Sequence, residues 1–209
     1  MLRRLSRLCI SLSGLTLESE LITKAKQSMR ERALLKRSKL AAATRESGAE
    51  AVARTGLSFL DKSPGAVISG YAAVQDELDP LALLEALAGE GHTIVLPAVI
   101  ARDTPLEFRV WRPGDPLERQ AFGVPTPGHG AATLDPDIVL APLAAFDRDG
   151  YRLGYGGGYY DRTLAGLRER RGVVAVGMAF ESQEVDSVPH DTYDQRLDWI
   201  LTPSGAFAT

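Results

Sequence analysis

Hydrophobic and polar positions follow several different spacings along this chain, and each spacing predicts its own type of element. Residues 18 to about 53 are densely charged, contain neither proline nor glycine before Gly48, and repeat leucines near helical spacing. This pattern predicts one long helix. A second, short helix is predicted over residues 57–60, and the adjacent proline and glycine in residues 62–65 predict a turn.

Short apolar runs predict buried strands in the rest of the chain. These runs occupy residues 66–71, 93–99, 137–143, 173–180 and 197–202, and an alternating run at 106–111 predicts a further strand. Helices are predicted at residues 81–88, where Asp79 and Pro80 form a helix start, and at 161–170. Residues 112–136 are rich in proline and glycine, which predicts a surface loop. The alternation indicates an α/β fold: a single domain with a largely parallel sheet flanked by helices in three layers.

The stretch R-L-G-Y-G-G-G-Y-Y-D-R-T at residues 152–163 carries the most visible candidate chemistry. Glycines let the backbone approach a phosphate closely, and the helix predicted to follow offers free N–H groups and a positive dipole end to an anion. Arg152 and Arg162 flank the loop, the tyrosines offer ring faces and hydroxyls, and Asp161 offers Mg²⁺ a carboxylate. Together these residue types favour a nucleoside triphosphate bound beside an aromatic ligand.

Spacing alone leaves another explanation of this stretch open. The chain has no G-x-x-x-x-G-K-[ST] phosphate loop, and G-Y-G-G-G-Y lacks the third glycine of a dinucleotide-binding fingerprint. A glycine-rich turn that merely packs beneath tyrosines is the structural alternative. The preceding segment F-D-R-D-G-Y at 146–151 has some features of a calcium loop but lacks the later ligands, which favours a simple turn there.

Composition narrows the classes of protein to which the chain can belong. Its 209 residues suit one large domain, and 44% hydrophobic with 24% charged residues suit an ordinary core. The formal net charge of -3 argues against a nucleic-acid-binding surface, and no apolar run approaches the roughly 18 residues of a membrane span. The single cysteine, Cys9, cannot form an internal disulfide, which fits a reducing compartment. We expect a monomeric, cytoplasmic protein without nucleic-acid or membrane partners.

Residues 1–23 differ in composition from the rest of the chain. They contain several arginines and serines and no acid before Glu18. This composition is typical of an organellar transit peptide and partly of a bacterial signal peptide, although Arg7 interrupts the apolar stretch. We expect residues 1–23 to be a disordered extension, the product of a mis-assigned start, or a targeting leader, and residues 24–209 to form the domain.

Residues 152–162 resemble the signature of the 5-formyltetrahydrofolate cyclo-ligase family, also called 5,10-methenyltetrahydrofolate synthetases. Other segments resemble the same family: F-D-R-D-G-Y, V-Q-D-E-L at 74–78, A-K-Q-S-M-R at 25–30, G-M-A-F-E-S-Q at 177–183 and V-P-H-D-T-Y-D-Q-R-L-D at 188–198. The resemblance runs from about residue 24 to residue 202. It departs from some members at Gly157, where they have a lysine that could contact phosphate.

The resemblance implies an enzyme that uses ATP and Mg²⁺ to cyclise 5-formyltetrahydrofolate to 5,10-methenyltetrahydrofolate, releasing ADP and phosphate through an imidate phosphate intermediate. It implies catalytic roles for Arg152 and Tyr159. The implied ATP-binding residues are Lys26, Arg30, Arg152, Leu153, Gly154, Tyr155, Gly156, Gly157, Gly158, Tyr159 and Tyr160. The implied contacts of the reduced folate are Ala72, Glu77, Tyr155, Gly156, Gly157, Gly158 and Tyr159, with Glu77 accepting hydrogen bonds from the pterin.

The same resemblance implies that Asp161 and Asp194 hold the metal. Asp198 is an alternative to Asp194, and its structural explanation is a local cap or salt bridge. Lys26 and Arg30 are spaced i,i+4, so both project from one helix face, where they could grip a triphosphate. Without the resemblance, this pair would be read as part of a solvated basic face.

Two other functions compete with the ligase. A related protein could bind folate or nucleotide without turnover, as a sensor or scavenger, but the presence of Asp161 and both cations, Lys26 and Arg30, argues against it. A different ATP-using enzyme on the same fold could take another carboxylated or aromatic substrate. Glu77→Gln discriminates against that case, because it should abolish folate binding while sparing ATP. A purely structural role is disfavoured, because glycine and tyrosine clusters offer little to a flat interface.

Overall fold

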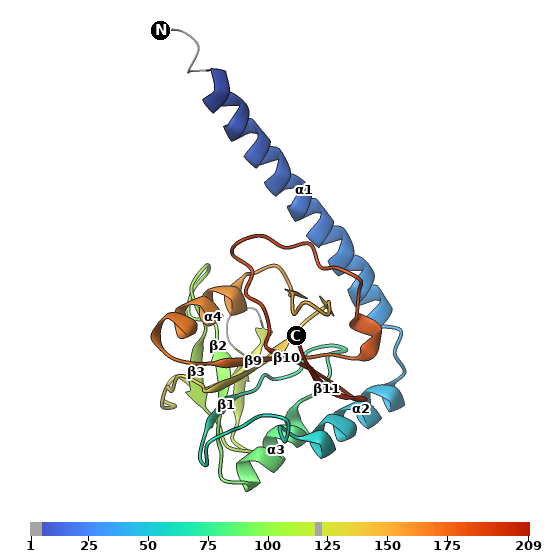
Figure 1. Cartoon of the computed structure of the whole chain (residues 1–209). Helices are drawn as coiled ribbons and strands as arrows, with labels where there is room; N and C mark the ends of the chain where they lie inside the picture. Colours follow the sequence, from blue (N-terminus) through green and yellow to red (C-terminus); the bar gives the residue numbers. More distant parts are fainter. Residues whose placement is uncertain (1–5, 120–122) are drawn as a thin grey trace.

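The structure is a computed structural model that describes residues 6–119 and 123–209, with side chains from residue 19 onward. The first residues of the expected extension, 1–5, lie outside the described residues. The helices are α1 (Ser6–Arg37), α2 (Ala42–Thr55), α3 (Leu81–Gly89), α4 (Tyr159–Arg170) and the short 3-10 helix η2 (Glu181–Gln183). Figure 1 shows α1 extending well beyond the rest of the chain, while the other elements gather around the sheet.

A seven-stranded sheet forms the centre of the domain, in the order β11-β10-β9-β6-β1-β2-β3. The strands from β10 to β2 in this order are parallel, and β11 and β3 are antiparallel edge strands. Their bounds are β1 Val67–Ser69, β2 Thr93–Ala98, β3 Glu107–Val110, β6 Ile138–Pro142, β9 Val174–Met178, β10 Trp199–Thr202 and β11 Gly205–Ala208. The predicted single α/β domain with a largely parallel sheet is confirmed.

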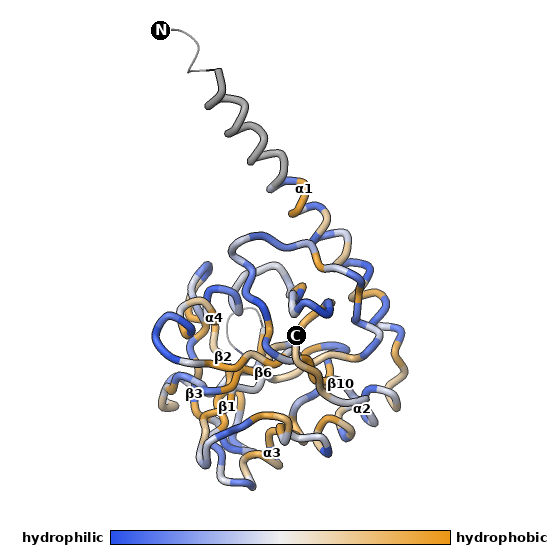
Figure 2. Tube along the Cα trace, viewed as in Figure 1, coloured by the Kyte–Doolittle hydropathy of each residue, from blue (hydrophilic) through white to orange (hydrophobic). Residues whose placement is uncertain are grey.

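Helices cover both faces of the sheet and produce the three layers expected from the sequence (Figure 1). On one face, Leu83 and Leu87 of α3 pack in a cluster that includes Leu140. On the other face, Leu164 of α4 packs in a cluster that includes Val139. Neighbouring residues of β6 thus enter opposite cores, as the alternation of side chains along a strand requires. The strands carry the strongly hydrophobic part of the trace in Figure 2, consistent with burial on both sides.

The single helix predicted over residues 18 to about 53 is wrong, because the chain forms two helices there. α1 ends at Arg37, and α2 begins at Ala42 after a short turn. α2 packs against α3 and thereby buries Val52 in the core. A straight continuation of α1 could not bring Val52 onto the sheet, so a long-range contact decides the break.

Several smaller elements also differ from the prediction. Residues 57–60 form a turn rather than a helix, because α2 ends at Thr55 and its C-cap residue, Gly56, has a φ of +58°. The expected loop 112–136 contains a two-stranded ribbon of β4 (Leu117–Arg119) and β5 (Pro125–Pro127). A second ribbon, β7 (Ala145–Phe146) with β8 (Arg152–Leu153), encloses the expected turn, and the edge strand β11 was not expected. These strands are too short, or too rich in proline and glycine, to show a period.

The predicted start of the helix at residues 81–88 holds with a shift of one residue. Pro80 occupies the N-cap position of α3, and the Asp79 carboxylate accepts a hydrogen bond from the Leu81 N–H at 2.9 Å.

In the part of the chain that is described, no helix is both long enough and apolar enough to cross a membrane.

Candidate functional site

The predicted site residues gather at the carboxyl edge of the parallel strands. β1 and β6 are parallel neighbours in the middle of the sheet. The segment after β1 carries Glu77, and the segment after β6 forms the β7–β8 ribbon and then the glycine loop, residues 154–158. α1 contacts β7 and η2, which brings its C-terminal half to this edge. Ligands of open α/β sheets commonly bind at this edge.

Two positions of the glycine loop have backbone conformations that would be strained for any residue other than glycine. Gly156 has φ +95°, and Gly158 has φ +65° where it caps α4. A Cβ atom on Gly157 would lie 2.7 Å from the ring of Tyr159. No side chain of the described residues caps α4, so the loop leads to a helix N-terminus whose amide groups and dipole favour an anion.

Arginine side chains hold both ends of the glycine loop. Arg30 of α1 donates from Nε to the Gly154 carbonyl at 2.7 Å, and its guanidinium would be 3.5 Å from a Cβ on Gly156. Arg162 folds back from the first turn of α4 and donates from Nη2 to the Gly157 carbonyl at 2.5 Å. The loop therefore presents positive charge from two elements that are remote in sequence.

Arg37, Glu77 and Tyr155 form a polar chain, here called the tyrosine cluster, in which Arg37 and Glu77 are buried and the Tyr155 side chain is partly exposed. The Tyr155 hydroxyl donates to Oε1 of Glu77 and accepts a hydrogen bond from Nη1 of Arg37 at 2.8 Å. Oε2 of Glu77 accepts the Val74 N–H at 2.8 Å. Burial raises the pKa of Glu77, although the hydrogen bonds from Tyr155 and Val74 and the Arg37 charge oppose this shift. Burial and the nearby Glu77 charge raise the pKa of Tyr155 far above its usual value, so the hydroxyl keeps its proton.

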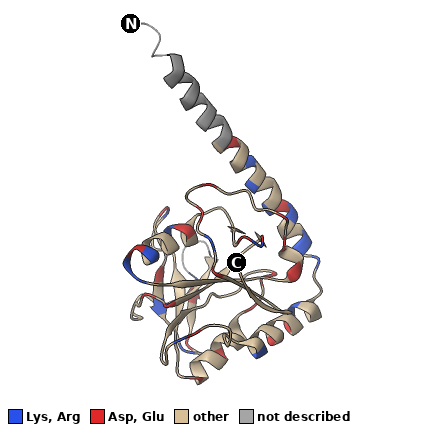
Figure 3. Ribbon diagram, viewed as in Figure 1, with Lys and Arg blue, Asp and Glu red and all other residues tan. Residues whose placement is uncertain are grey.

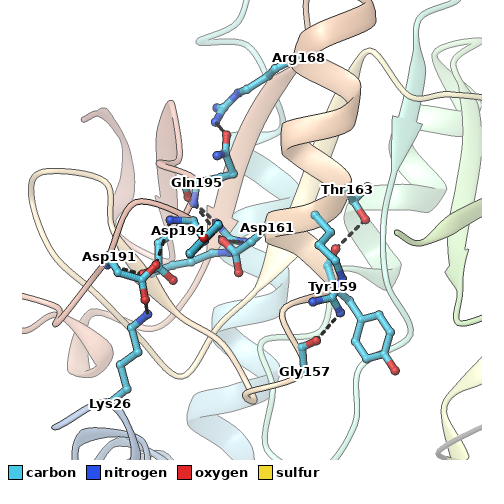
Figure 4. Close-up of polar contacts among 12 residues, drawn as sticks. Lys26, Gly157, Tyr159, Asp161, Thr163, Arg168, Asp191, Asp194 and Gln195 are labelled. Carbon is cyan, nitrogen blue, oxygen red and sulfur yellow. Dashed lines mark hydrogen bonds and ion pairs between the residues drawn. The ribbon is translucent and has the colours of Figure 1, made fainter. Parts of the chain in front are cut away.

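Lys26, Asp191 and Asp194 form a second group, here called the lysine cluster (Figure 4). The Lys26 ammonium lies 2.5 Å from Oδ2 of Asp194 and 3.0 Å from Oδ2 of Asp191. Burial acts to lower the pKa of Lys26, but the hydrogen bonds and charges of the two aspartates outweigh it and raise that pKa. Charged residues also line α1 beyond Lys26, as Figure 3 shows.

Asp161 and Arg152 connect α4 to the loop that carries the lysine cluster. Arg152 is buried and donates from Nη2 to Oδ1 of Asp161 at 2.8 Å and from Nη1 to the Gln195 carbonyl at 2.6 Å. The Gln195 N–H in turn donates to Oδ1 of Asp161 at 3.0 Å. The Asp161 carboxylate is therefore bonded to the backbone of Gln195, the residue that follows Asp194 (Figure 4).

These carboxylates are compatible with Mg²⁺ when phosphate supplies the remaining ligands. Among the described residues no group of three or more His, Cys, Asp or Glu side chains could hold a metal. Mg²⁺ commonly takes only one or two carboxylates together with phosphate oxygens and waters. Asp194 would have to exchange its Lys26 contact, and Oδ1 of Asp161 already accepts two hydrogen bonds. Two carboxylates are a number that Mg²⁺ accepts beside a triphosphate, but both are bonded to protein groups in this structure.

The remaining predicted residues lie in different parts of the fold. Ala72 lies in the segment between β1 and Glu77 and is partly exposed, whereas Leu153 is buried in β8. Tyr159 begins α4, where its carbonyl accepts the Thr163 hydroxyl at 2.7 Å and the Arg162 guanidinium lies 5.3 Å from its ring centroid. Tyr160 packs against the core, and burial raises its pKa far above the usual value. The Asp198 carboxylate is bonded to Arg168 at 2.9 Å and to the Ala175 N–H at 2.7 Å, which supports its structural explanation.

Sequence reasoning missed Arg37, Asp191 and Gln195. Arg37 follows Arg30 by seven residues on the helix that carries both, a spacing that places it on the same face, so a signal for Arg37 was present. Asp191 stands three residues before Asp194, but its role depends on Lys26, which is 165 residues away. Gln195 acts through its backbone, for which the residue type gives no signal.

Comparison with known proteins gives a consistent result. The family model described as the 5-formyltetrahydrofolate cyclo-ligase family matches residues 22–203. The chain is 35% identical over 190 residues to the 5-formyltetrahydrofolate cyclo-ligase of Mycolicibacterium smegmatis, covering 86% of this chain and 94% of that one. It is 29% identical over 184 residues to the enzyme of the same name from Haemophilus influenzae, covering 86% and 98% of the two chains.

Two solved structures have the same fold and similar sequences. The 5,10-methenyltetrahydrofolate synthetase of Mycoplasma pneumoniae matches with a TM-score of 0.68 at 27% identity, covering 85% of this chain and 98% of that one. The 5,10-methenyltetrahydrofolate synthetase of Aquifex aeolicus matches with a TM-score of 0.71 at 27% identity, covering 88% and 92%.

Proposed function

Because the chain belongs to the 5-formyltetrahydrofolate cyclo-ligase family and is an enzyme of this class, we propose that it couples ATP cleavage to the cyclisation of 5-formyltetrahydrofolate. The products would be 5,10-methenyltetrahydrofolate, ADP and phosphate. One observation carries the proposal: the glycine loop is bonded at Tyr155 to the Glu77 carboxylate and ends at Gly158, which caps α4. A single loop thus connects an acceptor for pterin N–H groups with a site for phosphate.

The folate would lie at the Glu77 end of the loop. A buried carboxylate accepts N–H donors strongly, and the pterin ring presents such donors along one edge. The partly exposed Ala72 lies in the same segment as Glu77, and Tyr155 offers its ring beside the carboxylate. The backbone of Gly156, Gly157 and Gly158 would leave room for the folate as well as for the phosphates.

ATP would lie at the α4 end of the loop, its triphosphate between the helix N-terminus and α1. Lys26 and Arg30 project from one face of α1 toward this region, and Arg30 already contacts the loop. We propose that Lys26 exchanges its aspartates for phosphate oxygens when ATP binds. Asp161 and Asp194 would hold Mg²⁺, which neutralises charge on the phosphates when bound.

The reaction requires activation of a formamide oxygen, which is a poor leaving group. The formyl oxygen attacks the γ-phosphorus of ATP, the bond to ADP breaks, and an imidate phosphate forms. The second folate nitrogen then attacks the activated carbon, and phosphate leaves with the oxygen and takes up the proton that this nitrogen loses. This chain would contribute by aligning both substrates on one loop and by placing cations around the transferring group. Arg152 would act mainly by holding Asp161, because its guanidinium is buried against that carboxylate; the Tyr159 role stays a prediction.

The experiment that tests the proposal follows the near-ultraviolet absorbance of methenyltetrahydrofolate after mixing the protein with 5-formyltetrahydrofolate, Mg²⁺ and ATP. We expect a rising band that needs ATP and Mg²⁺ and is lost in Asp161→Ala. The matched control is Asp135→Ala, which removes an exposed carboxylate paired with Arg170 at the far end of α4 and should leave the rate intact. A flat trace from folded wild-type protein would contradict the proposal and favour a binder without turnover.

A monomer located in the cytoplasm is also part of the proposal. Light scattering at assay concentration tests the first, and fractionation of the source cells tests the second. A dimer in the scattering experiment would contradict the monomer without affecting the proposed reaction.

A further inference from the structure

Arg37 is a buried cation whose position the proposed reaction does not explain. It ends α1 and is only 3% exposed. Nη1 donates to two neutral acceptors, the Tyr155 hydroxyl at 2.8 Å and the Leu143 carbonyl at 3.3 Å. Nε is buried and has no hydrogen-bond partner among the residues that the structure describes. Burying a cation costs free energy, so its position next to Tyr155 calls for a compensating role.

The compensating charge for Arg37 is Glu77, which it reaches through Tyr155. The hydroxyl accepts from the guanidinium and donates to the carboxylate, so the two charges face each other across one phenol oxygen. Because the phenol keeps its proton, the direction of both hydrogen bonds is fixed. Such a chain is stronger than its separate bonds, since each polarises the next.

We propose that Arg37 is a positioning residue for the folate site: acting through the Tyr155 hydroxyl, it keeps Glu77 ionised and oriented toward the pterin. This inference rests on the proposed function, because it assumes that Glu77 accepts the pterin N–H groups. It adds to that function a residue on α1 that controls the ionisation and orientation of the Glu77 carboxylate. Folding α1 onto the domain therefore both brings ATP ligands to the loop and prepares the folate acceptor.

The groups around Glu77 act in opposing directions. Burial raises the Glu77 pKa, and the Asp79 charge adds to this, whereas Tyr155, the Val74 N–H and Arg37 lower it. Tyr71 and Tyr160 also lie close enough to feel the Glu77 charge, but both are held protonated by burial. Removal of the Arg37 charge therefore favours protonation of Glu77. A protonated carboxyl oxygen can no longer accept a hydrogen bond from the pterin.

The direct test is the titration of Glu77 in the free protein by carboxyl ¹³C NMR, with the Glu77 signal assigned from Glu77→Gln. We expect Arg37→Gln, which keeps a hydrogen-bond donor without the charge, to raise the Glu77 pKa by roughly one unit. Tyr155→Phe should raise it as well, and Arg37→Lys should restore part of the difference. The matched control, Arg32→Gln, removes an exposed cation from the same helix and should leave the titration unchanged.

Folate binding supplies a second readout. In Arg37→Gln the loss of affinity for 5-formyltetrahydrofolate on acidification should begin at a pH roughly one unit higher than in wild type, because binding follows the ionisation of Glu77. ATP affinity should not change. An unshifted Glu77 pKa in folded Arg37→Gln and in Tyr155→Phe would overturn the inference; if Arg37→Gln does not fold, Arg37→Lys and Tyr155→Phe decide it. If Glu77→Gln itself leaves folate binding intact, the proposed folate site fails, whatever Arg37 does to the Glu77 pKa.

Discussion

The tyrosine cluster and the lysine cluster both join α1 to the rest of the domain, but they differ in how their charges are satisfied. In the tyrosine cluster, Arg37 and Glu77 are buried and meet through a neutral phenol. In the lysine cluster, one partly exposed cation contacts two carboxylates directly. Buried polar chains are rigid because every open hydrogen bond is costly, whereas exposed pairs exchange partners at little cost. The first cluster is therefore suited to a fixed arrangement of side chains, and the second to contacts that can exchange.

The largest effect that we predict concerns Glu77→Gln in the tyrosine cluster. The amide presents an N–H donor toward the pterin donors and accepts fewer hydrogen bonds than a carboxylate. The affinity for 5-formyltetrahydrofolate should fall at least about 100-fold, the loss expected when charge-assisted hydrogen bonds are removed. ATP affinity should stay within about twofold, and isothermal titration with each ligand measures both. The matched control is Glu85→Gln, an exposed acid on α3; equal losses for both ligands would argue against separate ends of the site.

The next largest difference is in folding stability between Arg37→Ala and Lys26→Ala. Arg37→Ala empties a buried volume and removes the donor to the Tyr155 hydroxyl, whereas the Leu143 carbonyl keeps its hydrogen bond from Gln183, so we expect a loss of about 2–3 kcal/mol in the free energy of unfolding. Lys26→Ala removes contacts at the surface and should cost less than about 1 kcal/mol. Urea denaturation of both variants, with unchanged m-values, measures the comparison. Similar losses in the two variants would contradict the distinction between a fixed and an exchangeable cluster.

A smaller effect is predicted for the glycine loop that lies between the clusters. Gly158→Ala forces a residue with a Cβ atom to φ +65° and places that atom 2.7 Å from Nη1 of Arg162. We expect a destabilisation of about 1 kcal/mol, the cost of a left-handed conformation for alanine, together with weaker ATP binding. Gly172→Ala is the control, because no heavy atom lies within 4 Å of its Cβ position and its φ is not left-handed. A variant Gly158→Ala as stable as wild type would show that the loop adopts another conformation.

The smallest effect is the pH and salt dependence of the lysine cluster. Hydrogen bonds from the Tyr193 N–H and Lys26 outweigh burial and lower the pKa of Asp191 below its usual 3.8, while the aspartates raise the pKa of Lys26 above its usual 10.5. The Asp191 contribution to stability is therefore present above pH 3.8 and is lost as pH falls through its folded pKa. The Lys26 contribution is present below pH 10.5 and is lost as pH rises through its folded pKa.

Melting temperatures of wild type and Lys26→Met, measured across pH and at low and high salt, test the pH range over which the lysine cluster contributes to stability. The difference between the two proteins should be largest near neutral pH, shrink below pH 3.8 and above pH 10.5, and fall with added salt because this pair is partly exposed. A difference that is absent near neutral pH, or that does not depend on pH or salt, would contradict a contribution from the Lys26 charge.

The parallel core and the glycine loop of the candidate site could be predicted from the sequence because both depend on local patterns. Apolar runs marked β1, β2, β6, β9 and β10, and the alternation with helices indicated the sheet type. The glycine loop was recognisable because positive φ values restrict the residue type, as at Gly156 and Gly158. The hairpin partner β11 and the ribbons β4–β5 and β7–β8 were missed, because their short strands are defined by a partner rather than by their own pattern.

The sequence by itself determined the α/β class, the residue types of the glycine loop and the resemblance to a family, since each depends on residues that are adjacent along the chain. Only the tertiary structure decided that α1 stops at Arg37 and that Arg37 and Glu77 share the Tyr155 hydroxyl. It also decided that Lys26 meets Asp191 and Asp194, more than 160 residues away along the chain. The sequence pattern around a charged residue on a helix is the same whether its side chain faces water or a buried acceptor. Its partner, and therefore its role, is set by how the helix packs on the sheet.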